Sequence, residues 1–278
     1  MRIAVLADIH GNLPAFEAAL AGARRAAPDL LVIAGDVVNG APDSGACWQL
    51  ARDEADVLLR GNHERYVLDR GTPAGDPAWL RPRFRPLAWA AEQIRPWFDE
   101  VRACPIAARV SDDVRVMHAS PADDHVSLYP WTDDEQLERV LDPAPEALLV
   151  RAHNHLPFHR SLADGRLLVS AGAVGLALVG KPEAQFALLT HHARRGWTVQ
   201  HVSLPYDVDA AVARFVDTGY LREVGPMAQV FLREVATGSH HLVPFVRFEQ
   251  GWRAATGTPD ADDDASLERA LRAFLALA

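Results

Sequence analysis

The sequence predicts an α/β fold built on a parallel sheet. Apolar runs at residues 1–7 and 29–34 have the length and composition of buried strands, and the Ala/Leu-rich stretch 13–26 between them has helical spacing. A strand, a helix and a second strand in this order form a right-handed crossover between parallel strands. Polar residues follow both apolar runs, and open α/β sheets place their sites at the carboxyl ends of strands. We therefore expect this sheet to carry a functional site.

The size and composition are those of a globular protein. The chain has 278 residues, enough for one large domain or two small ones, with 49% hydrophobic and 23% charged residues. No apolar run reaches the roughly 18 residues of a membrane-spanning helix, and the first residues lack the apolar core of a signal peptide. We expect a cytoplasmic protein without a membrane partner.

The charge balance restricts the partners. Lys and Arg number 28 against 37 Asp and Glu, which gives a net charge of −9. Nonspecific binding to a nucleic-acid duplex depends on basic side chains that neutralise phosphates, so nucleic acid is expected only as a nucleotide or phosphodiester substrate. A small phosphorylated substrate is compatible with the negative net charge, because bound cations can make the electrostatic potential at the site positive. The two cysteines, Cys47 and Cys104, are too few for a disulfide framework and are expected to be buried or half-buried.

Other apolar runs predict further strands, at residues 56–60, 106–110, 114–117, 147–151, 167–170, 186–189 and 198–202. We assign the last two to a second sheet that contains antiparallel strands. Helical patterns in the same part of the chain occupy residues 43–53, 85–99 and 132–141. Stretches rich in Gly, Pro and polar residues predict loops over 69–83 and 122–131.

The character of the sequence changes after residue 205. Helices are predicted over 207–215, 220–236, 242–255 and 265–277, with a polar linker over 256–264. This part carries no concentrated set of metal ligands. We expect a catalytic domain over residues 1–205 and a helical extension over 206–278 that packs on the core, forms a lid or takes part in a homo-oligomer.

Potential metal ligands follow strand after strand. Asp8 and His10 follow the first apolar run and are separated by one residue. Residues i and i+2 of an extended segment point to the same side, so these two side chains are expected to converge. Asp36 follows the second run, and Asn62, His63 and Glu64 follow the third. Taken singly, Asp36 fits a cap or turn and Asn62 fits a turn. Their repetition at successive strand ends favours one shared site.

Two later runs end in the same way, with His118 after the first and His153 and His155 after the second. The donors are oxygens and imidazole nitrogens without a thiolate, which suits Mn²⁺, Fe, Zn²⁺ or Ni²⁺ better than Mg²⁺ or Ca²⁺. Without Glu64 these are eight donor residues, more than one tetrahedral site needs, whereas a pair of cations uses them.

The motifs D-x-H, G-D, G-N-H-E, a strand-end His and H-x-H resemble, in order and rough spacing, the five blocks of the calcineurin-like metallophosphoesterases. The resemblance covers residues 1–205 and is closest to small single-chain prokaryotic phosphodiesterases. It implies a four-layer α-β-β-α sandwich and two divalent transition ions, with Mn²⁺ the first expectation. The ligands of the first ion would be Asp8, His10, Asp36 and His155. Those of the second would be Asp36, Asn62, His118 and His153, with Asp36 bridging.

The resemblance also implies a reaction. A hydroxide that bridges the cations would attack a phosphodiester, or also a monoester, because such ions make hydroxide available near neutral pH. His63 would be a general acid or a hydrogen-bond donor to the transition state rather than a ligand, and Glu64 would orient it.

Two positions depart from the family pattern, with Ala152 in place of a glycine before H-x-H and residues 170–175 in place of N-P-G-S-V-G. Because the ligands are kept, we expect metal binding to survive and substrate contacts to differ. A dinucleoside polyphosphate phosphatase and a phosphoprotein phosphatase stay open. The absence of D-R-G after Asp36 counts against the second. A non-catalytic metal-binding scaffold or interaction protein is the alternative of another class, and the complete donor set counts against it. His125 is equally compatible with a substrate contact and with an ordinary surface position.

Overall fold

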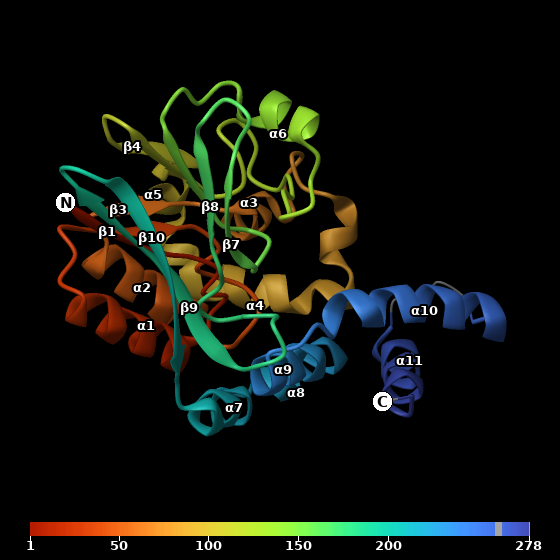
Figure 1. The fold of residues 1–278 in the computed structure, drawn as a ribbon. Coiled ribbons are helices and arrows are strands. Elements are labelled where there is room, and N and C mark those ends of the chain that lie inside the picture. Colours follow the sequence, from red (N-terminus) through yellow and green to blue (C-terminus); the bar gives the residue numbers. More distant parts are fainter. Residues whose placement is uncertain (259–262, 278) are drawn as a thin grey trace.

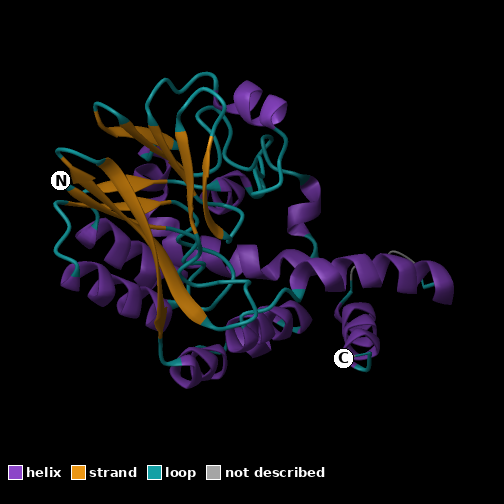
Figure 2. Ribbon diagram, viewed as in Figure 1, coloured by secondary structure: helices purple, strands orange, loops and turns teal. Residues whose placement is uncertain are grey.

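Two five-stranded sheets pack face to face, and helices cover both outer faces (Figures 1 and 2). This computed structural model describes residues 1–258 and 263–277. The arrangement is the four-layer α-β-β-α sandwich that the sequence predicts. Residues 259–262, in the predicted polar linker, lie outside the described residues. No helix in the described ranges is both long and apolar enough to cross a membrane.

The first sheet has the order β10-β9-β1-β2-β3, with parallel pairing among β1, β2 and β3 and antiparallel pairing of β9 to β1 and β10. Its strands are β1 Arg2–Leu6, β2 Leu30–Ala34, β3 Val57–Leu59, β9 Glu183–His192 and β10 Gly196–Pro205. The assignment of residues 186–189 and 198–202 to the second sheet is wrong. Every residue of β9 from Ala184 to Leu189 is buried, so this strand fits the interior of a sheet covered on both faces, beside β1.

The second sheet has the order β4-β5-β6-β8-β7. Its strands are β4 Ala107–Ser111, β5 Val114–Met117, β6 Leu148–Arg151, β7 Pro157–Ser161 and β8 Leu167–Ala171. The strand β7 is missing from the sequence prediction. It lies at the edge of the sheet and has a mostly polar sequence without a buried residue, so no apolar run marks it.

Side chains of β1 alternate between the space between the two sheets and the layer of outer helices. Ile3 and Val5 lie between the two sheets, whereas Ala4 and Leu6 face the outer helices, because successive residues of a strand point to opposite faces. The outer layer on this side contains α1 Leu13–Arg25, α2 Ser44–Glu54 and α4 Arg85–Ile94. On the far side, α6 Asp134–Leu141 packs two leucines onto the second sheet.

In the chain, the segment from β3 of the first sheet to β4 of the second is mostly helical, and it begins at the motif Asn62-His63-Glu64. The helix α3 spans Asn62–Asp69, and short 3-10 turns follow at Pro77–Leu80 and Pro82–Phe84. The helix predicted over 85–99 is interrupted, since α4 ends at Ile94, a 3-10 turn covers Arg95–Trp97 and α5 spans Phe98–Ala103. Pro96 has no backbone N–H to continue the helical hydrogen bonds, which explains the break.

The C-terminal helices are α7 Val208–Asp217, α8 Tyr220–Val224, α9 Pro226–Thr237, α10 Leu242–Thr256 and α11 Asp264–Leu275. The helix predicted over 220–236 is two helices, because Gly225 has φ +75° and Pro226 follows it. The helices share an apolar cluster with Ala41 and Leu176 of the sandwich. A domain boundary at residue 205 stays a prediction.

One hydrogen bond between the helices and the sandwich can be tested. Tyr220 is fully buried, and its hydroxyl donates a 2.7 Å hydrogen bond to the Gly40 carbonyl. We expect Tyr220→Phe to lower the free energy of unfolding by about 1–2 kcal/mol, because the carbonyl loses its partner while the ring volume is kept. Urea denaturation measures the change. Tyr129→Phe, at a half-exposed position, is the control, and equal losses in both variants would contradict the role of this bond.

Candidate metal centre

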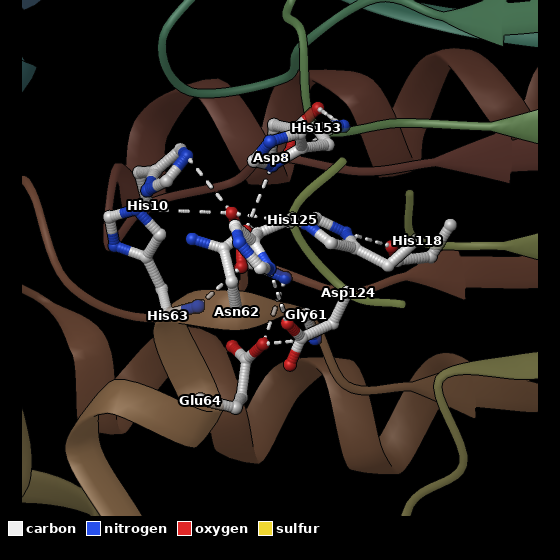
Figure 3. A network of polar contacts seen from close by, with 12 residues as sticks. Asp8, His10, Gly61, Asn62, His63, Glu64, His118, Asp124, His125 and His153 are labelled. Carbon is white, nitrogen blue, oxygen red and sulfur yellow. Dashed lines mark hydrogen bonds and ion pairs between the residues drawn. The ribbon is translucent and has the colours of Figure 1, made fainter. Parts of the chain in front are cut away.

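The structure brings all the predicted ligands to one place, at the carboxyl ends of strands from both sheets (Figure 3). The predicted residues form three groups, and within each group the donor atoms lie within 4.8 Å of one another. Their members are Asp8, His10 and His155 in the first, Asp36, His118 and His153 in the second, and His10, Asp36 and His63 in the third. The first two match the two half-sites that the resemblance implies, and the third connects them.

The backbone that carries these side chains is left-handed rather than extended. Among the described residues, seven non-glycine residues have positive φ, and six of them belong to the site: Asp8, His10, Asp36, Asn39, His153 and His155. The expectation that Asp8 and His10 converge as alternate residues of an extended strand is therefore wrong. The strand ends at Leu6, and a left-handed backbone at both positions brings the side chains together.

In the first group, two imidazole nitrogens face each other. Nε2 of His10 lies 3.1 Å from Nε2 of His155. Nδ1 of each ring donates to a backbone carbonyl, that of Asn39 for His10 and that of Leu176 for His155, both at 2.8 Å. Since a carbonyl only accepts, each neutral ring carries its proton on Nδ1 and turns a lone pair toward the other ring. A cation between the two lone pairs stabilises such an arrangement.

The second group repeats this geometry. Nδ1 of His118 donates to the Ala34 carbonyl at 2.8 Å, and its Nε2 faces Oδ2 of Asp36 at 3.3 Å. Oδ1 of Asn62 lies 3.0 Å from the same Nε2 and 2.9 Å from Nδ1 of His153. With its amide turned over, Asn62 would donate to these atoms instead. In the orientation shown, its oxygen points at the two ring nitrogens that a cation would join.

Asp36 lies between the two groups. Its Oδ2 is 3.8 Å from Nε2 of His10 and 3.3 Å from Nε2 of His118. The residue is 1% exposed, so its charge has no water to stabilise it. Burial alone would raise the pKa of Asp36, but the nearby His118 and His63 outweigh it and hold that pKa well below its usual range. An ionised carboxylate at this point can bridge two cations.

The protonation of the other donors also suits divalent cations. Burial lowers the pKa of His153 to about 3 and that of His155 to about 4, so both rings are neutral, the form that binds metals. Burial raises the pKa of Asp8 to about 8. Burial would lower the pKa of His118, but the carboxylates of Asp36 and Asp8 raise it to about 9. The cluster thus holds protons where a bound cation would supply positive charge, and the donors fit such ions.

Glu64 holds two ligand loops rather than His63. Its carboxylate accepts four backbone N–H groups, those of Asp36 at 2.9 Å, Val37 at 2.7 Å, Val38 at 3.1 Å and Gly61 at 2.7 Å. Among the described residues no bond joins it to the His63 ring. The expectation that Glu64 orients His63 is wrong. The carboxylate fixes the segments before Asn39 and before Asn62.

Asn39 is the residue that orients His63, and the sequence analysis missed this role. Nδ2 of Asn39 lies 2.8 Å from Nδ1 of His63. An amide NH₂ group only donates, so Nδ1 accepts and the neutral ring carries its proton on Nε2, which lies 4.0 Å from Oδ2 of Asp36. Burial lowers the pKa of His63, which keeps the ring neutral. The only sequence signal was the position of Asn39 three residues after Asp36.

Two other charged residues support the loop after His118. Arg151 is fully buried and donates to the carbonyls of Ala119, Leu128 and Val126 at 2.8–2.9 Å. Arg65 pairs with Asp124 through two hydrogen bonds of 2.6 and 2.8 Å. His125 is 58% exposed and lies 3.1 Å from Asp123, beside the site in Figure 3. A substrate contact by His125 stays a prediction.

The departures from the family pattern leave the cluster in place. Ala152 is buried and is not among the residues with positive φ, so its backbone does not require glycine. In the second departure Gly175 is kept, and a Cβ there would lie 1.7 Å from the Ile9 carbonyl oxygen. Gly61 is equally constrained, because a Cβ would lie 2.2 Å from Oδ1 of Asp36.

Comparison with known proteins agrees with this geometry. Residues 1–191 match the calcineurin-like phosphoesterase family. The chain therefore belongs to the calcineurin-like phosphoesterases, which confirms the resemblance that its motifs carry. Membership in this family, together with the donor groups, identifies a metal-binding member of a family of hydrolases.

Two individual relatives have low sequence identity to this chain. Serine/threonine-protein phosphatase 1 of Salmonella typhimurium is 32% identical over 151 residues, which cover 49% of this chain and 66% of that protein, just under two thirds. An uncharacterized protein of Methanocaldococcus jannaschii is 22% identical over 234 residues, 77% of this chain and 91% of that protein.

Solved structures show the same fold. A metallophosphoesterase from Sphaerobacter thermophilus has a TM-score of 0.68 at 22% identity, with 86% of this chain and 100% of that chain covered. A hypothetical protein from Pyrococcus horikoshii OT3 has a TM-score of 0.69 at 18% identity, with 86% and 99% covered.

The position of Asp36 between the two groups predicts a specific loss. We expect the wild-type protein to bind about two Mn²⁺ ions per chain and Asp36→Asn to bind fewer than one, because an amide cannot bridge two cations as a carboxylate does. Elemental analysis after gel filtration measures the ratio, with circular dichroism as the check on folding. His192→Ala, at an exposed position, is the control. No bound metal in the wild-type protein after Mn²⁺ addition would contradict the site.

The pKa values of Asp8 and His118 predict the pH dependence of metal binding. Both pKa values are raised above their usual ranges, to about 8 and about 9, so at pH 7 both groups carry protons that a cation must displace. Mn²⁺ affinity should therefore rise as the pH increases from 6.5 to 8.5, by about tenfold per unit for each proton released, with a smaller slope once the pH passes the pKa of Asp8. Calorimetry in buffers with different ionisation enthalpies counts the protons. An affinity that is constant over this range would contradict the assignment.

Proposed function

We propose that this protein hydrolyses phosphodiesters with two divalent transition ions, Mn²⁺ being the first choice. The observation that supports this best is the position of the buried Asp36 carboxylate between two sets of nitrogen and oxygen donors. One ion would be held by Asp8, His10, Asp36 and His155. The other would be held by Asp36, Asn62, His118 and His153.

Bound as a pair, such ions supply a nucleophile from water near neutral pH and offset the charge of the phosphoryl oxygens. The protein residues do the rest. The backbone bonds of His10, His118 and His155 fix which ring nitrogen faces the ions. Asn62 contributes a neutral oxygen, so the ligands add less negative charge than a carboxylate in that position would, and the centre stays able to attract a phosphate.

His63 acts on the leaving group. Its Nδ1 accepts from Asn39, so its Nε2–H is available to donate a hydrogen bond to the leaving oxygen as negative charge develops there. The lowered pKa favours this neutral donor over a protonated general acid. The ring is 23% exposed, more than Asp36, so it lies at the accessible edge of the site.

A phosphomonoester substrate is the second candidate. The relative from Salmonella typhimurium is a serine/threonine-protein phosphatase, which favours monoesters. The stretch Val37-Val38-Asn39-Gly40 differs from the D-R-G motif of the phosphoprotein branch, and this favours diesters. A non-catalytic scaffold does not account for three imidazole rings, those of His10, His118 and His155, whose Nδ1 atoms are bonded to backbone carbonyls so that Nε2 faces the other donors.

A substrate screen tests the proposal. The Mn²⁺-loaded protein is assayed with bis(4-nitrophenyl) phosphate, 4-nitrophenyl phosphate, cyclic nucleotides, dinucleotides and a phosphopeptide. We expect the highest kcat/KM on a diester. Preference for the phosphopeptide would instead select the second candidate. Lack of hydrolysis of all of them by metal-loaded protein would reject both.

His63→Ala separates hydrogen-bond donation to the leaving oxygen from metal binding. We expect this variant to keep about two Mn²⁺ ions per chain and to lose about 100-fold or more in kcat on bis(4-nitrophenyl) phosphate, because the leaving oxygen loses its donor. Steady-state kinetics with elemental analysis measure both quantities. His192→Ala, an exposed histidine, is the matched control. Unchanged turnover in His63→Ala would remove His63 from this role.

A further inference from the structure

A large cavity opens beside His63. Its volume is about 600 Å³, within the range of small-molecule sites, and Asn39 and His63 are part of its lining. Residues of α9 and α10 in the C-terminal extension also line it, among them Phe231, Leu242 and Val246. The cavity therefore connects the candidate metal centre with the helices that have no ligands of their own.

Aromatic rings lead from the centre into the cavity. The His63 ring contacts Tyr66 with centroids 5.5 Å apart, and Tyr66 contacts Trp79 at 4.9 Å. Tyr66 and Trp79 line the cavity, together with Phe84 on the same side. His63 thus has one nitrogen directed at the metal ligands and its ring at the start of an apolar path.

Of the charged residues that line the cavity, Arg83 and Glu249 pair with each other, and Arg247 is exposed to solvent. Glu249 is 1% exposed and accepts from Nη2 of Arg83 at 2.7 Å and from Nε of Arg253 at 2.8 Å. A sugar or a nucleobase needs several hydrogen-bond partners when it is buried, since each unpaired polar group is costly. A hydrocarbon does not, and it gains from every apolar atom that the walls cover.

We propose that this cavity binds the leaving group of the substrate and that this group is an apolar alkyl or aryl alcohol. The inference rests on the proposed phosphodiester hydrolysis. The reaction breaks the bond between phosphorus and the leaving oxygen, adds the oxygen of water to phosphorus, and gives a proton of that water to the leaving oxygen, which departs as an alcohol. The Nε2–H group of His63 donates a hydrogen bond to this oxygen as negative charge develops on it. The alcohol leaves into the cavity that His63 lines. The C-terminal helices select the substrate by the shape of this wall.

Alcohol binding tests the cavity without catalysis or metal. Butanol, hexanol and octanol are titrated into the metal-free protein, and the fluorescence of Trp79 in the cavity wall reports binding, with Trp79→Phe to identify its signal. We expect the dissociation constant to fall about two- to fourfold for each added methylene. A dissociation constant that does not change with chain length would overturn the proposal.

Two tryptophan substitutions on α10 locate the binding. Val246→Trp fills the cavity and should abolish the dependence on chain length. Ala254→Trp adds the same ring to an exposed position outside the cavity and should keep it. If Val246→Trp does not fold, Leu242→Trp in the same wall replaces it, and folding is checked by circular dichroism. Equal behaviour of the cavity variant and the control would overturn the assignment.

The product ratio then connects the cavity with the leaving group. Methyl octyl phosphate releases either octanol or methanol, and nuclear magnetic resonance counts both products. We expect octanol to exceed methanol by at least tenfold in the wild-type protein and the ratio to fall toward one in Val246→Trp. Methanol in excess would place the octyl chain on the other side of phosphorus and overturn the proposal. Absence of any hydrolysis, with normal alcohol binding, would count against the proposed function and not against the cavity.

Discussion

The buried carboxylate of Glu64 is the constraint on which the rest of the site depends. It accepts N–H groups from the segment Asp36–Val38 and from Gly61, so one side chain holds the loops after β2 and β3 at a fixed separation. Burial and the nearby Asp36 raise the pKa of Glu64 to about 7, whereas the N–H bond from Gly61 opposes this. The protein thus buries Glu64 in addition to the carboxylates of Asp8 and Asp36, at a cost that the four N–H bonds offset.

The left-handed backbone at the ligands also lowers the stability of the fold. Positive φ at residues such as Asp8, His10 and His153 costs of order 1 kcal/mol each. Hydrogen bonds to neighbouring loops maintain it, for example from the Asp8 N–H to the Gly35 carbonyl and from the His153 N–H to the Asp8 carboxylate. Asp, Asn and His tolerate this region better than other side chains, so the residues that bind metals also relieve the strain. Chemistry and backbone geometry select the same residue types.

The sequence predicts the metal ligands of this site but not the hydrogen bonds that hold them in place. The ligands could be predicted, because each follows an apolar run and belongs to a short motif. The four layers followed from the motifs as a whole. The roles of Glu64 and Asn39 could not be predicted, because they depend on which loops meet in space rather than on residue type. The place of β9 beside β1 was missed for a similar reason, since a strand buried on both faces carries no sign of its sheet. The edge strand β7 lacked an apolar run altogether.

One loop, residues 36–43, joins the metal ligands to the C-terminal helices. Glu64 holds its beginning, and Asn39 in its middle fixes the tautomer of His63. Its end is held from the extension, where Tyr220 donates to the Gly40 carbonyl and Arg214 pairs with Asp43 at 2.9 Å. The helices α7 and α8 thus hold the loop that orients His63, and α9 and α10 of the same extension line the cavity. Substrate selection and hydrogen-bond donation by His63 therefore both depend on the extension, which gives a physical reason for a family member to carry helices beyond its sandwich.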